Sequence, residues 1–334
     1  MSLNYDLYTS GARRSSIRAA EEQVRNDQLD VERLAEQLRL DVSNDYYNLQ
    51  GADELVRINR AAITNAEASL RDAQALEQAG VGTRFDVLRS QVQLANATQD
   101  LTNSLSQQQI ASRQLATRLS LAQAVNVTAA DPVEIAGLWN PTLEESIILA
   151  FQNRAELAQV LAQRNISQQQ RRIALAELGP QVSLTAEYDV GKNDIFDNGQ
   201  DFSDDYSLGA NVALNLFDGG AARARAAQRE ADIAIAETQF ADQRNQVRFE
   251  VEQAYSQLQS NLENIQTASV ALEQAREALR LARLRFQAGV GTQTDVINAE
   301  NDLTNAEGNR VTAILDYNRA LASLRRAISS GQPR

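Results

Sequence analysis

The chain has 334 residues, with 44 acidic and 32 basic side chains and a formal net charge of −12. It contains no cysteine and no histidine, which excludes disulfides, thiol nucleophiles, serine–histidine catalytic pairs and zinc sites with the usual ligands. The acidic balance argues against nucleic acid as a partner, because phosphate binding needs clustered basic side chains. With only four prolines, the composition favours long helices, and we expect neither an enzyme nor a cofactor.

The first repeat, residues 1–121, begins with an alternating segment at 2–8 that predicts a β-strand. A proline-free segment follows at 12–79, with apolar residues at three- and four-residue steps. This pattern predicts a single coiled-coil helix about 100 Å long. Two glycines in the turn 80–83 end that helix, and a return helix is expected at 84–121. The repeat is therefore expected to form a strand followed by a long antiparallel helical hairpin.

The middle of the chain changes character. Residues 122–180 are expected to form an equatorial connector with two shorter helices, the first of which opens with a capping box from Thr142 to Glu145. Residues 181–217 then alternate apolar and polar side chains in two stretches, around an acidic loop expected at 190–205. One apolar and one polar face over about ten residues is typical of a strand in an outer-membrane β-barrel.

The second repeat, residues 218–330, copies the first at an offset of 209 residues. The sequence Ala-Gly-Val-Gly-Thr at 79–83 occurs again at 288–292, which places the second hairpin tip at 289–292. An aspartate follows at the same distance in each copy, as Asp86 and as Asp295. The predicted fold class is therefore mainly α with a β portion, built as a duplicated strand-and-hairpin unit.

This doubled pattern closely resembles the outer membrane efflux protein family, the TolC-like channels. The resemblance covers essentially the whole chain and keeps the family's order of segments. The segments that carry it are residues 7–11, 79–88, 142–145, 153–157, 216–220 and 288–297.

The resemblance implies a homotrimer in the outer membrane of a diderm bacterium. Its strands would close one shared β-barrel in contact with outer-membrane lipid, and its helices would close a tunnel in the periplasm. Such a channel is the passive exit duct of a tripartite efflux pump or a type I secretion system. Its partners would be a periplasmic membrane fusion (adaptor) protein and, indirectly, an inner-membrane transporter.

The start of the chain departs from the family pattern. The two copies align from Leu7 and Leu216, and about 75 residues with two helices and a strand precede the second copy, whereas only six residues precede the first. The family would place a further helix and strand before Ser2, so the resemblance implies that the chain is N-terminally truncated. That truncation would also account for the lack of a recognisable secretory signal.

The two hairpin tips are the main candidate sites. Their glycines are expected to let the chain reverse. The resemblance adds that the tips dock onto the adaptor. The residues concerned are Gly80, Val81, Gly82 and Thr83 in the first tip and Gly289, Val290, Gly291 and Thr292 in the second.

Asp86 and Asp295 are candidates for a periplasmic gate. A carboxylate in the first turn of a helix stabilises that helix, so capping is the simpler interpretation. The resemblance suggests that three copies of each would form acidic rings that narrow the tunnel.

A soluble structural coiled-coil protein, or a periplasmic adaptor, is the alternative function. The alternating strands distinguish the two, because a spacer has no need of a lipid-compatible face. An adaptor would also carry lipoyl-like and small β-barrel segments, and none is recognisable here. The sequence therefore favours the duct.

Overall fold

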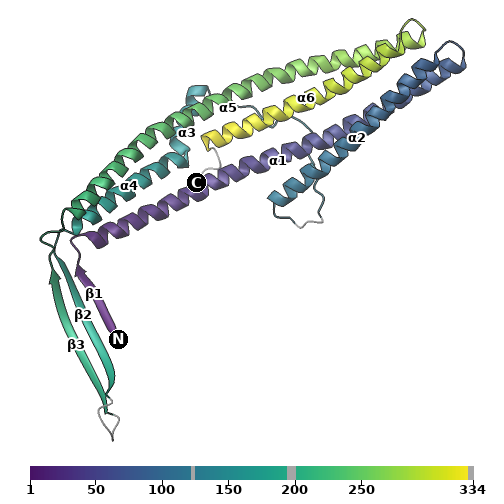
Figure 1. The fold of residues 1–334 in the computed structure, drawn as a ribbon. Helices are drawn as coiled ribbons and strands as arrows, with labels where there is room; N and C mark the ends of the chain where they lie inside the picture. Colours follow the sequence, from purple (N-terminus) through teal and green to yellow (C-terminus); the bar gives the residue numbers. More distant parts are fainter. Residues whose placement is uncertain (122–124, 194–200, 330–334) are drawn as a thin grey trace. The chain divides into compact units, whose positions relative to one another are not determined.

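The computed structural model describes residues 1–121, 125–193 and 201–329. The fold consists of three strands and six helices within those ranges, as Figure 1 shows. In chain order they are β1 (Ser2–Tyr8), α1 (Ala12–Gln78), α2 (Arg84–Arg118), α3 (Leu143–Asn153), α4 (Ala155–Ala176), β2 (Gln181–Asn193), β3 (Asp201–Ala213), α5 (Ala221–Gln287) and α6 (Gln293–Ile328).

The helices begin and end close to their predicted positions, and β1 has the predicted bounds, while β2 and β3 extend into the loop predicted between them. The ladder between β2 and β3 continues beyond residue 190 as far as the pair Asn193 and Asp201, so the loop expected at 190–205 is wrong at both ends. Backbone hydrogen bonding extends the pair past the point where the side-chain alternation stops. Residues 194–200 lie outside the described part of the chain.

The chain divides into two compact units, and each contains parts of both repeats. The first unit consists of Met1–Arg33 and Arg154–Gln246, and the second of Leu34–Asn153 and Val247–Arg334. The long helices α1 and α5 therefore contribute residues to both units. The boundaries of the repeats in the sequence therefore differ from those of the compact units, because each unit forms where parts of the two repeats pack together.

The first unit contains an antiparallel sheet with the strand order β1-β2-β3. Leu184 on β2 lies between Tyr5 on β1 and Ala210 on β3, so the apolar positions of all three strands share one face. Polar residues occupy the other face, and on β2 these are Ser183, Thr185 and Glu187. Because no described residue of the first unit covers the apolar face, its large side chains are exposed. They include Tyr5, Leu184, Tyr188, Tyr206, Leu208 and Val212.

Ion pairs join the helices α4 and α5 of the first unit, and a cap fixes the turn that follows the sheet. On α4, Arg171 binds Glu230 of α5 at 2.6 Å. Before α5, both carboxylate oxygens of Asp218 accept backbone hydrogen bonds, at 2.8 Å from Gly220 and 2.7 Å from Ala222. These hydrogen bonds, that from Ala222 first, lower the pKa of Asp218. The chain therefore leaves β3 through a capped turn, which fixes where the long helix α5 begins.

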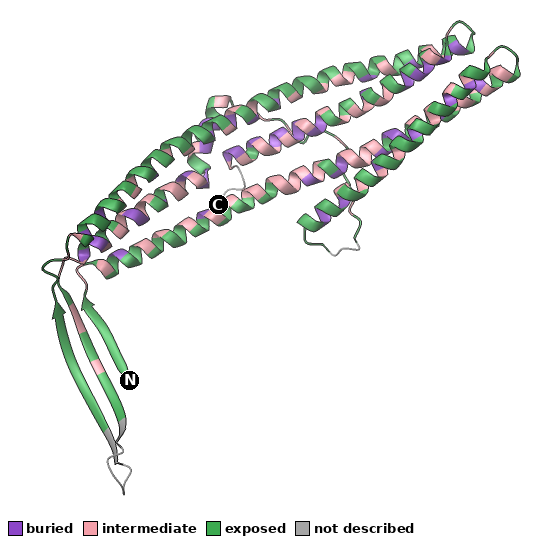
Figure 2. Ribbon diagram, in the orientation of Figure 1, coloured by how far each residue is buried: buried purple, intermediate pink, exposed green. Residues whose placement is uncertain are grey.

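The second unit packs the two hairpins against each other and ties them with the connector. The buried Asn318 of α6 donates to the carbonyl of Glu134 at 2.8 Å and accepts from the Ala136 N–H at 2.8 Å. On α1, Gln50 donates to the carbonyls of Asp131 and Pro132 at 3.0 Å. Figure 2 shows that buried residues are concentrated along α6, while α5 remains largely exposed.

Candidate functional site

Each hairpin turns through the same backbone geometry. In the first tip, Gly80 has a φ of 74°, a conformation that glycine adopts without steric cost. The N–H groups of Val81 and Gly82 then both donate to the Leu76 carbonyl, at 3.1 and 2.9 Å. The tip at 289–291 repeats the arrangement, with a φ of 72° at its first glycine and two hydrogen bonds of 3.0 Å. These bonds satisfy helix-end carbonyls and make each tip a defined turn.

The second glycine of each tip provides space. A Cβ on Gly82 would lie 2.9 Å from the Cβ of Leu76 and 2.9 Å from the Glu77 nitrogen. A Cβ on Gly291 would lie 3.0 Å from the Cβ of Arg285. Glycine is therefore favoured at the first position of each tip by its positive φ. At the second position it is favoured because neighbouring atoms leave no room for a Cβ.

A capping box fixes the start of each return helix. The Thr83 side chain accepts from the Asp86 N–H at 3.2 Å, and Asp86 Oδ2 accepts from the Thr83 N–H at 3.3 Å. Thr292 and Asp295 make the same pair of bonds at 3.2 and 3.0 Å. The Thr292 N–H lowers the pKa of Asp295. The capping role predicted for both aspartates is confirmed, because both carboxylates are engaged with their own threonine.

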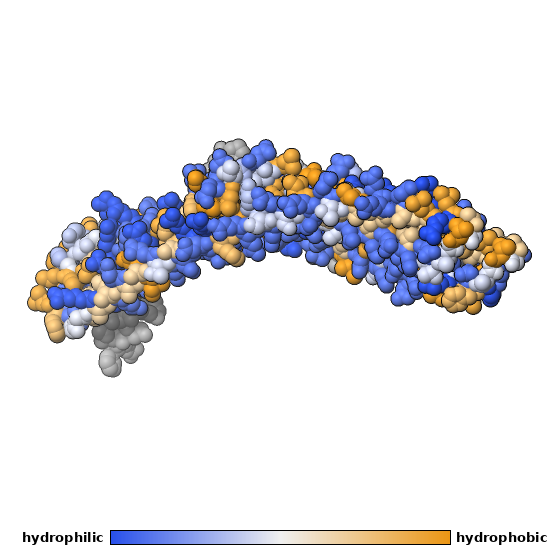
Figure 3. Space-filling model, turned by 90° about the horizontal axis from the view of Figure 1, so that it is seen from above, coloured by the Kyte–Doolittle hydropathy of each residue, from blue (hydrophilic) through white to orange (hydrophobic). Residues whose placement is uncertain are grey.

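The tips present apolar side chains to solvent. Val81 is 74% exposed, Val290 is 69% exposed and Phe85, in the first turn of α2, is 66% exposed. Figure 3 shows hydrophobic residues gathered at the tip end of the second unit. Exposed apolar side chains on a rigid turn are typical of a protein interaction site.

Behind the tips, a polar network joins the two hairpins. Glu300 of α6 is 3% exposed and accepts from Ser69 of α1 at 2.6 Å and from Arg283 of α5 at 2.9 Å. Arg283 also donates to the Asn65 side chain of α1 at 3.0 Å. A buried carboxylate with a guanidinium and a hydroxyl partner fixes the register of three helices at one level.

Three more hydrogen bonds connect α2 directly to α6 at this level. They run from Gln293 to Ser90 at 2.9 Å, from Arg89 to Thr294 at 2.8 Å and from Gln93 to Asn301 at 2.7 Å. The sequence analysis did not single out these residues or Glu300. The available signal was a difference between the repeats, since the positions equivalent to Glu300 and Arg283 are both glutamines, Gln91 and Gln74.

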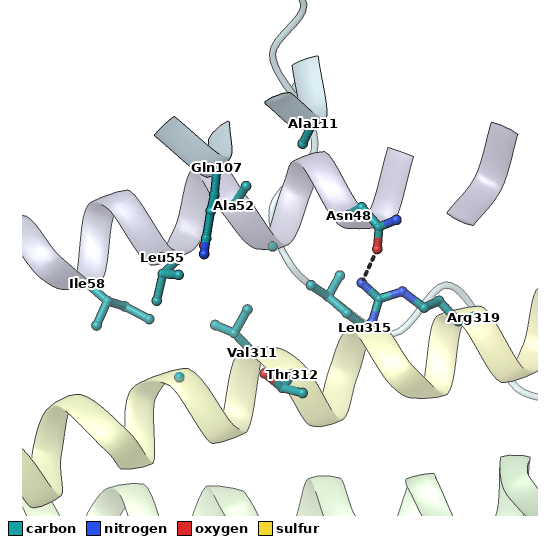
Figure 4. A pocket seen from close by; sticks show the side chains of 12 residues that line it. Asn48, Ala52, Leu55, Ile58, Gln107, Ala111, Val311, Thr312, Leu315 and Arg319 are labelled. Carbon is teal, nitrogen blue, oxygen red and sulfur yellow. Dashed lines mark hydrogen bonds between the residues drawn. The ribbon is translucent and has the colours of Figure 1, made fainter. Parts of the chain in front are cut away.

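A hollow of about 320 Å³ lies between α1, α2 and α6 (Figure 4). Leu315 fills part of it and approaches Gly51 closely, since a Cβ there would lie 2.9 Å from the leucine Cδ1. At one end Arg319 donates to Asn48 at 2.9 Å and pairs with Asp316 at 2.7 Å. Arg319, the only charged residue among those that line the hollow, is therefore already paired. The hollow is best described as a gap in the helix packing.

The described ranges contain neither a metal-binding cluster nor a membrane-spanning helix. No group of three or more carboxylates comes together there in a way that could hold a metal ion. No helix among the described residues is both long enough and apolar enough to cross a bilayer. The features with a clear geometry are thus the two tips, the network behind them and the sheet.

Known proteins resemble this chain along its whole length. The outer membrane efflux protein family matches residues 1–120 and 147–330. The pyoverdine export outer membrane protein OpmQ of Pseudomonas aeruginosa is 25% identical over 337 residues, which cover 99% of this chain and 69% of OpmQ. The OpmQ protein of Pseudomonas putida is 26% identical, with 99% and 70% covered.

Solved structures share the fold. The outer-membrane channel OprN superposes with a TM-score of 0.83 at 20% identity, covering 99% of this chain and 74% of OprN. The outer membrane protein VceC from Vibrio cholerae gives 0.81 at 21% identity, covering 98% and 78%. The open MtrE channel of Neisseria gonorrhoeae gives 0.81 at 20% identity, covering 97% and 73%. The chain therefore belongs to the outer membrane efflux protein family, and it is an outer-membrane exit duct with its helical part in the periplasm.

Proposed function

We propose that the duct docks a periplasmic adaptor protein through its two hairpin tips. The docking residues are Gly80, Val81, Gly82 and Thr83 with Gly289, Val290, Gly291 and Thr292. The exposed valines supply apolar contact area, and the helix-end bonds and capping boxes keep the turns rigid. A preorganised turn loses little conformational entropy when a partner binds.

Three copies of the chain assemble into the duct in this proposal. The sheet supports an assembly of several copies, because within the described ranges nothing covers its apolar face and no strand pairs with the outer edges of β1 and β3. Unpaired strand edges are not tolerated in lipid, so a lipid-facing sheet must be completed by further strands. A soluble spacer has no use for such a face, whereas a membrane-embedded barrel requires one.

Asp86 and Asp295 lie just inside the tips and are proposed as a gate. In a threefold assembly each would occur three times at one end of the tunnel. A ring of carboxylates in a narrow pore attracts cations and repels anions. Their capping bonds hold the carboxylates in place, so capping and gating are compatible.

Transport through this duct would be passive, with the energy supplied by an inner-membrane transporter that the adaptor connects to it. The duct, the adaptor and the transporter would together form a tripartite efflux pump or, as the other candidate, a type I secretion system. The family description, which names efflux, favours the pump.

Docking can be tested by charging the tips. In an efflux-deficient host that carries the cognate adaptor and pump, Val81→Asp with Val290→Asp should abolish transport without changing the mass of the detergent-extracted assembly. Gly308→Ala is the control, because a Cβ there meets nothing within 4 Å. Normal transport by the double aspartate variant would contradict the docking proposal.

A bulkier change tests the same sites through the backbone. Tryptophan at both Gly82 and Gly291 cannot be accommodated without moving the turns, since even a Cβ meets neighbouring atoms at about 3 Å. We expect transport to be lost while the assembly still forms, because the substitutions lie at the ends of the hairpins. Transport that survives this reshaping would also contradict docking at the tips.

A further inference from the structure

The helix ends beside the sheet carry exposed arginines, which we call the arginine rim. Arg14 and Arg18 lie in the first two turns of α1, and Arg223 lies in the first turn of α5. Arg14 and Arg223 are 209 positions apart, so both repeats place an arginine at the same point after their strand. Within the described part of the chain, the three guanidinium groups form no hydrogen bond or ion pair. Their charges are therefore available to a partner outside the chain.

Contacts between turns place the arginine rim at the end of the sheet, within the first unit. Ser10, just before α1, donates to the carbonyl of Pro180, just before β2, at 2.7 Å. Arg225 of α5 pairs with Glu177, just after α4, at 2.8 Å. The starts of α1 and α5 therefore lie at one level, where the three strands become helices (Figure 1).

Arg13 shows which side of the sheet the exposed part of α1 faces. Its guanidinium carbon lies 5.2 Å from the centre of the Tyr5 ring, and Tyr5 belongs to the apolar face of the sheet. Arg14 is the next residue on the helix, and Arg18 lies one turn beyond it. Ser15 is buried, so the other side of this turn packs inside the unit. The exposed arginines of α1 thus continue the apolar side of the sheet.

Arg14 and Arg223 do not serve the helices that carry them. A cation in the first turn of a helix is disfavoured by the helix dipole. The carboxylates close to these helix starts are also engaged with other groups. Glu177 pairs with Arg225, and Asp218 accepts two backbone hydrogen bonds. A stabilising role within the chain is therefore a poor explanation for the arginine rim.

We infer that the arginine rim binds the headgroups of anionic phospholipids in the leaflet of the outer membrane that faces the periplasm. The apolar side of the sheet faces lipid in the proposed duct, and the arginine rim begins where that side ends. The headgroup layer is roughly 5–7 Å thick. Arg18 lies about 9 Å along α1 from its start, which a long arginine side chain can bridge. A guanidinium can donate two parallel hydrogen bonds to one phosphate.

The charge of the rest of the chain makes such a local contact necessary for anionic lipid to bind. The chain has a net charge of −12, which repels an anionic surface. Basic side chains beside a membrane attract anionic lipids over a short range only. Binding at the arginine rim would therefore fix the depth at which the sheet sits in the bilayer. The inference rests on the proposed duct and adds to it a lipid-binding surface.

Thermal unfolding in detergent tests the inference, because a ligand that binds the native state raises its melting temperature. We would add dioleoyl phosphatidylglycerol, dioleoyl phosphatidylcholine or inorganic phosphate to the extracted full chain. Phosphatidylglycerol should raise the melting temperature of wild type more than the other two additions. Arg14→Gln with Arg18→Gln and Arg223→Gln should lose most of this shift. Arg14→Lys with Arg18→Lys and Arg223→Lys should keep it, because the charge is retained.

A matched variant on the periplasmic hairpins is the control. Arg60→Gln with Arg71→Gln and Arg310→Gln removes the same charge from three other exposed arginines and should keep the full shift. An undiminished shift in the glutamine variant of the arginine rim would overturn the inference. Equal loss in its lysine variant would overturn the assignment to charge. An equal shift with phosphatidylcholine would do the same, and an equal shift with inorganic phosphate would show a site for free anions only.

The mass of the extracted protein separates this inference from the proposed function. If the glutamine variant of the arginine rim has the mass of three chains and an unchanged lipid shift, the lipid site is wrong and the duct stands. If that variant alone separates into single chains, the arginines bind carboxylates of a neighbouring copy, and lipid is the wrong partner. If wild type is a single chain in detergent, the proposed assembly and the lipid site both fail.

Discussion

The sheet of the first unit and the hairpins of the second distribute their side chains in opposite ways. On β3, Leu208 is 82% exposed, and none of the unit's described residues covers it. On α6, Leu321 and Leu324 are buried, and so is the charged Glu300. The same chain therefore faces two solvents, one that accepts apolar side chains and one that does not. A duct that runs from the outer membrane into the periplasm requires such a division.

The largest expected effect comes from charging the lipid-facing side of the sheet. Leu208→Arg should prevent stable assembly in the outer membrane, since arginine on the lipid face of a barrel costs about 2–4 kcal/mol at the bilayer midplane. The neighbouring Ser207→Arg points to the polar face and should be tolerated. The yield of heat-resistant assembly in isolated outer membranes is the measurement, and equal yields would refute the assignment of the two faces.

A smaller effect is expected from the buried carboxylate of the hairpins. Glu300→Ala removes the acceptor of Ser69 and the ion-pair partner of the partly buried Arg283, which keeps its hydrogen bond to Asn65, and we expect a loss of about 1–3 kcal/mol. Gln91→Ala, the equivalent change in the first repeat, should have a smaller effect, as Gln91 is exposed in the chain. Thermal unfolding in detergent would compare the two variants.

A compensated variant sharpens that comparison. Replacing both Arg283 and Glu300 with leucine removes the buried charge together with its partner, which is often close to neutral. If this double variant were as unstable as Glu300→Ala alone, the loss would come from packing, and the ion pair would not be its cause.

The smallest effect concerns the capping box of the second tip. Thr292→Ala should cost about 1 kcal/mol, as for other helix N-caps. The pKa of Asp295 is lowered by the Thr292 N–H, so its stabilising effect is complete above the ordinary carboxyl pKa and is lost as pH falls through the lowered value. The melting temperatures of wild type and Asp295→Asn should therefore differ at neutral pH and converge in acid. A difference that persisted unchanged at the acid end would contradict this role.

Local signals in the sequence were enough to predict where the hairpins turn. The glycines at 80 and 289 and the Thr-x-x-Asp spacing after them act within a few residues, and the tips have the predicted turns and caps. The alternation on β2 likewise predicted the apolar face of the sheet. Here the repeat helped, because each local signal occurs twice.

Features that depend on contacts between distant segments were not predicted. The burial of Glu300 depends on Ser69, which lies 231 residues earlier, so helix periodicity could not reveal it. The ends of β2 and β3 depend on the partner strand, and the polar residues near Asn193 concealed their extent. A comparison of Glu300 with Gln91 between the repeats was the one sequence signal for this buried network.

The proposed duct contains several copies of this chain, and the mass of the protein after extraction from outer membranes measures how many. We expect a detergent-solubilised particle of three chains that resists mild heating and separates into single chains on boiling. A protein that is released without detergent, or that has the mass of one chain in detergent, would refute the proposed assembly.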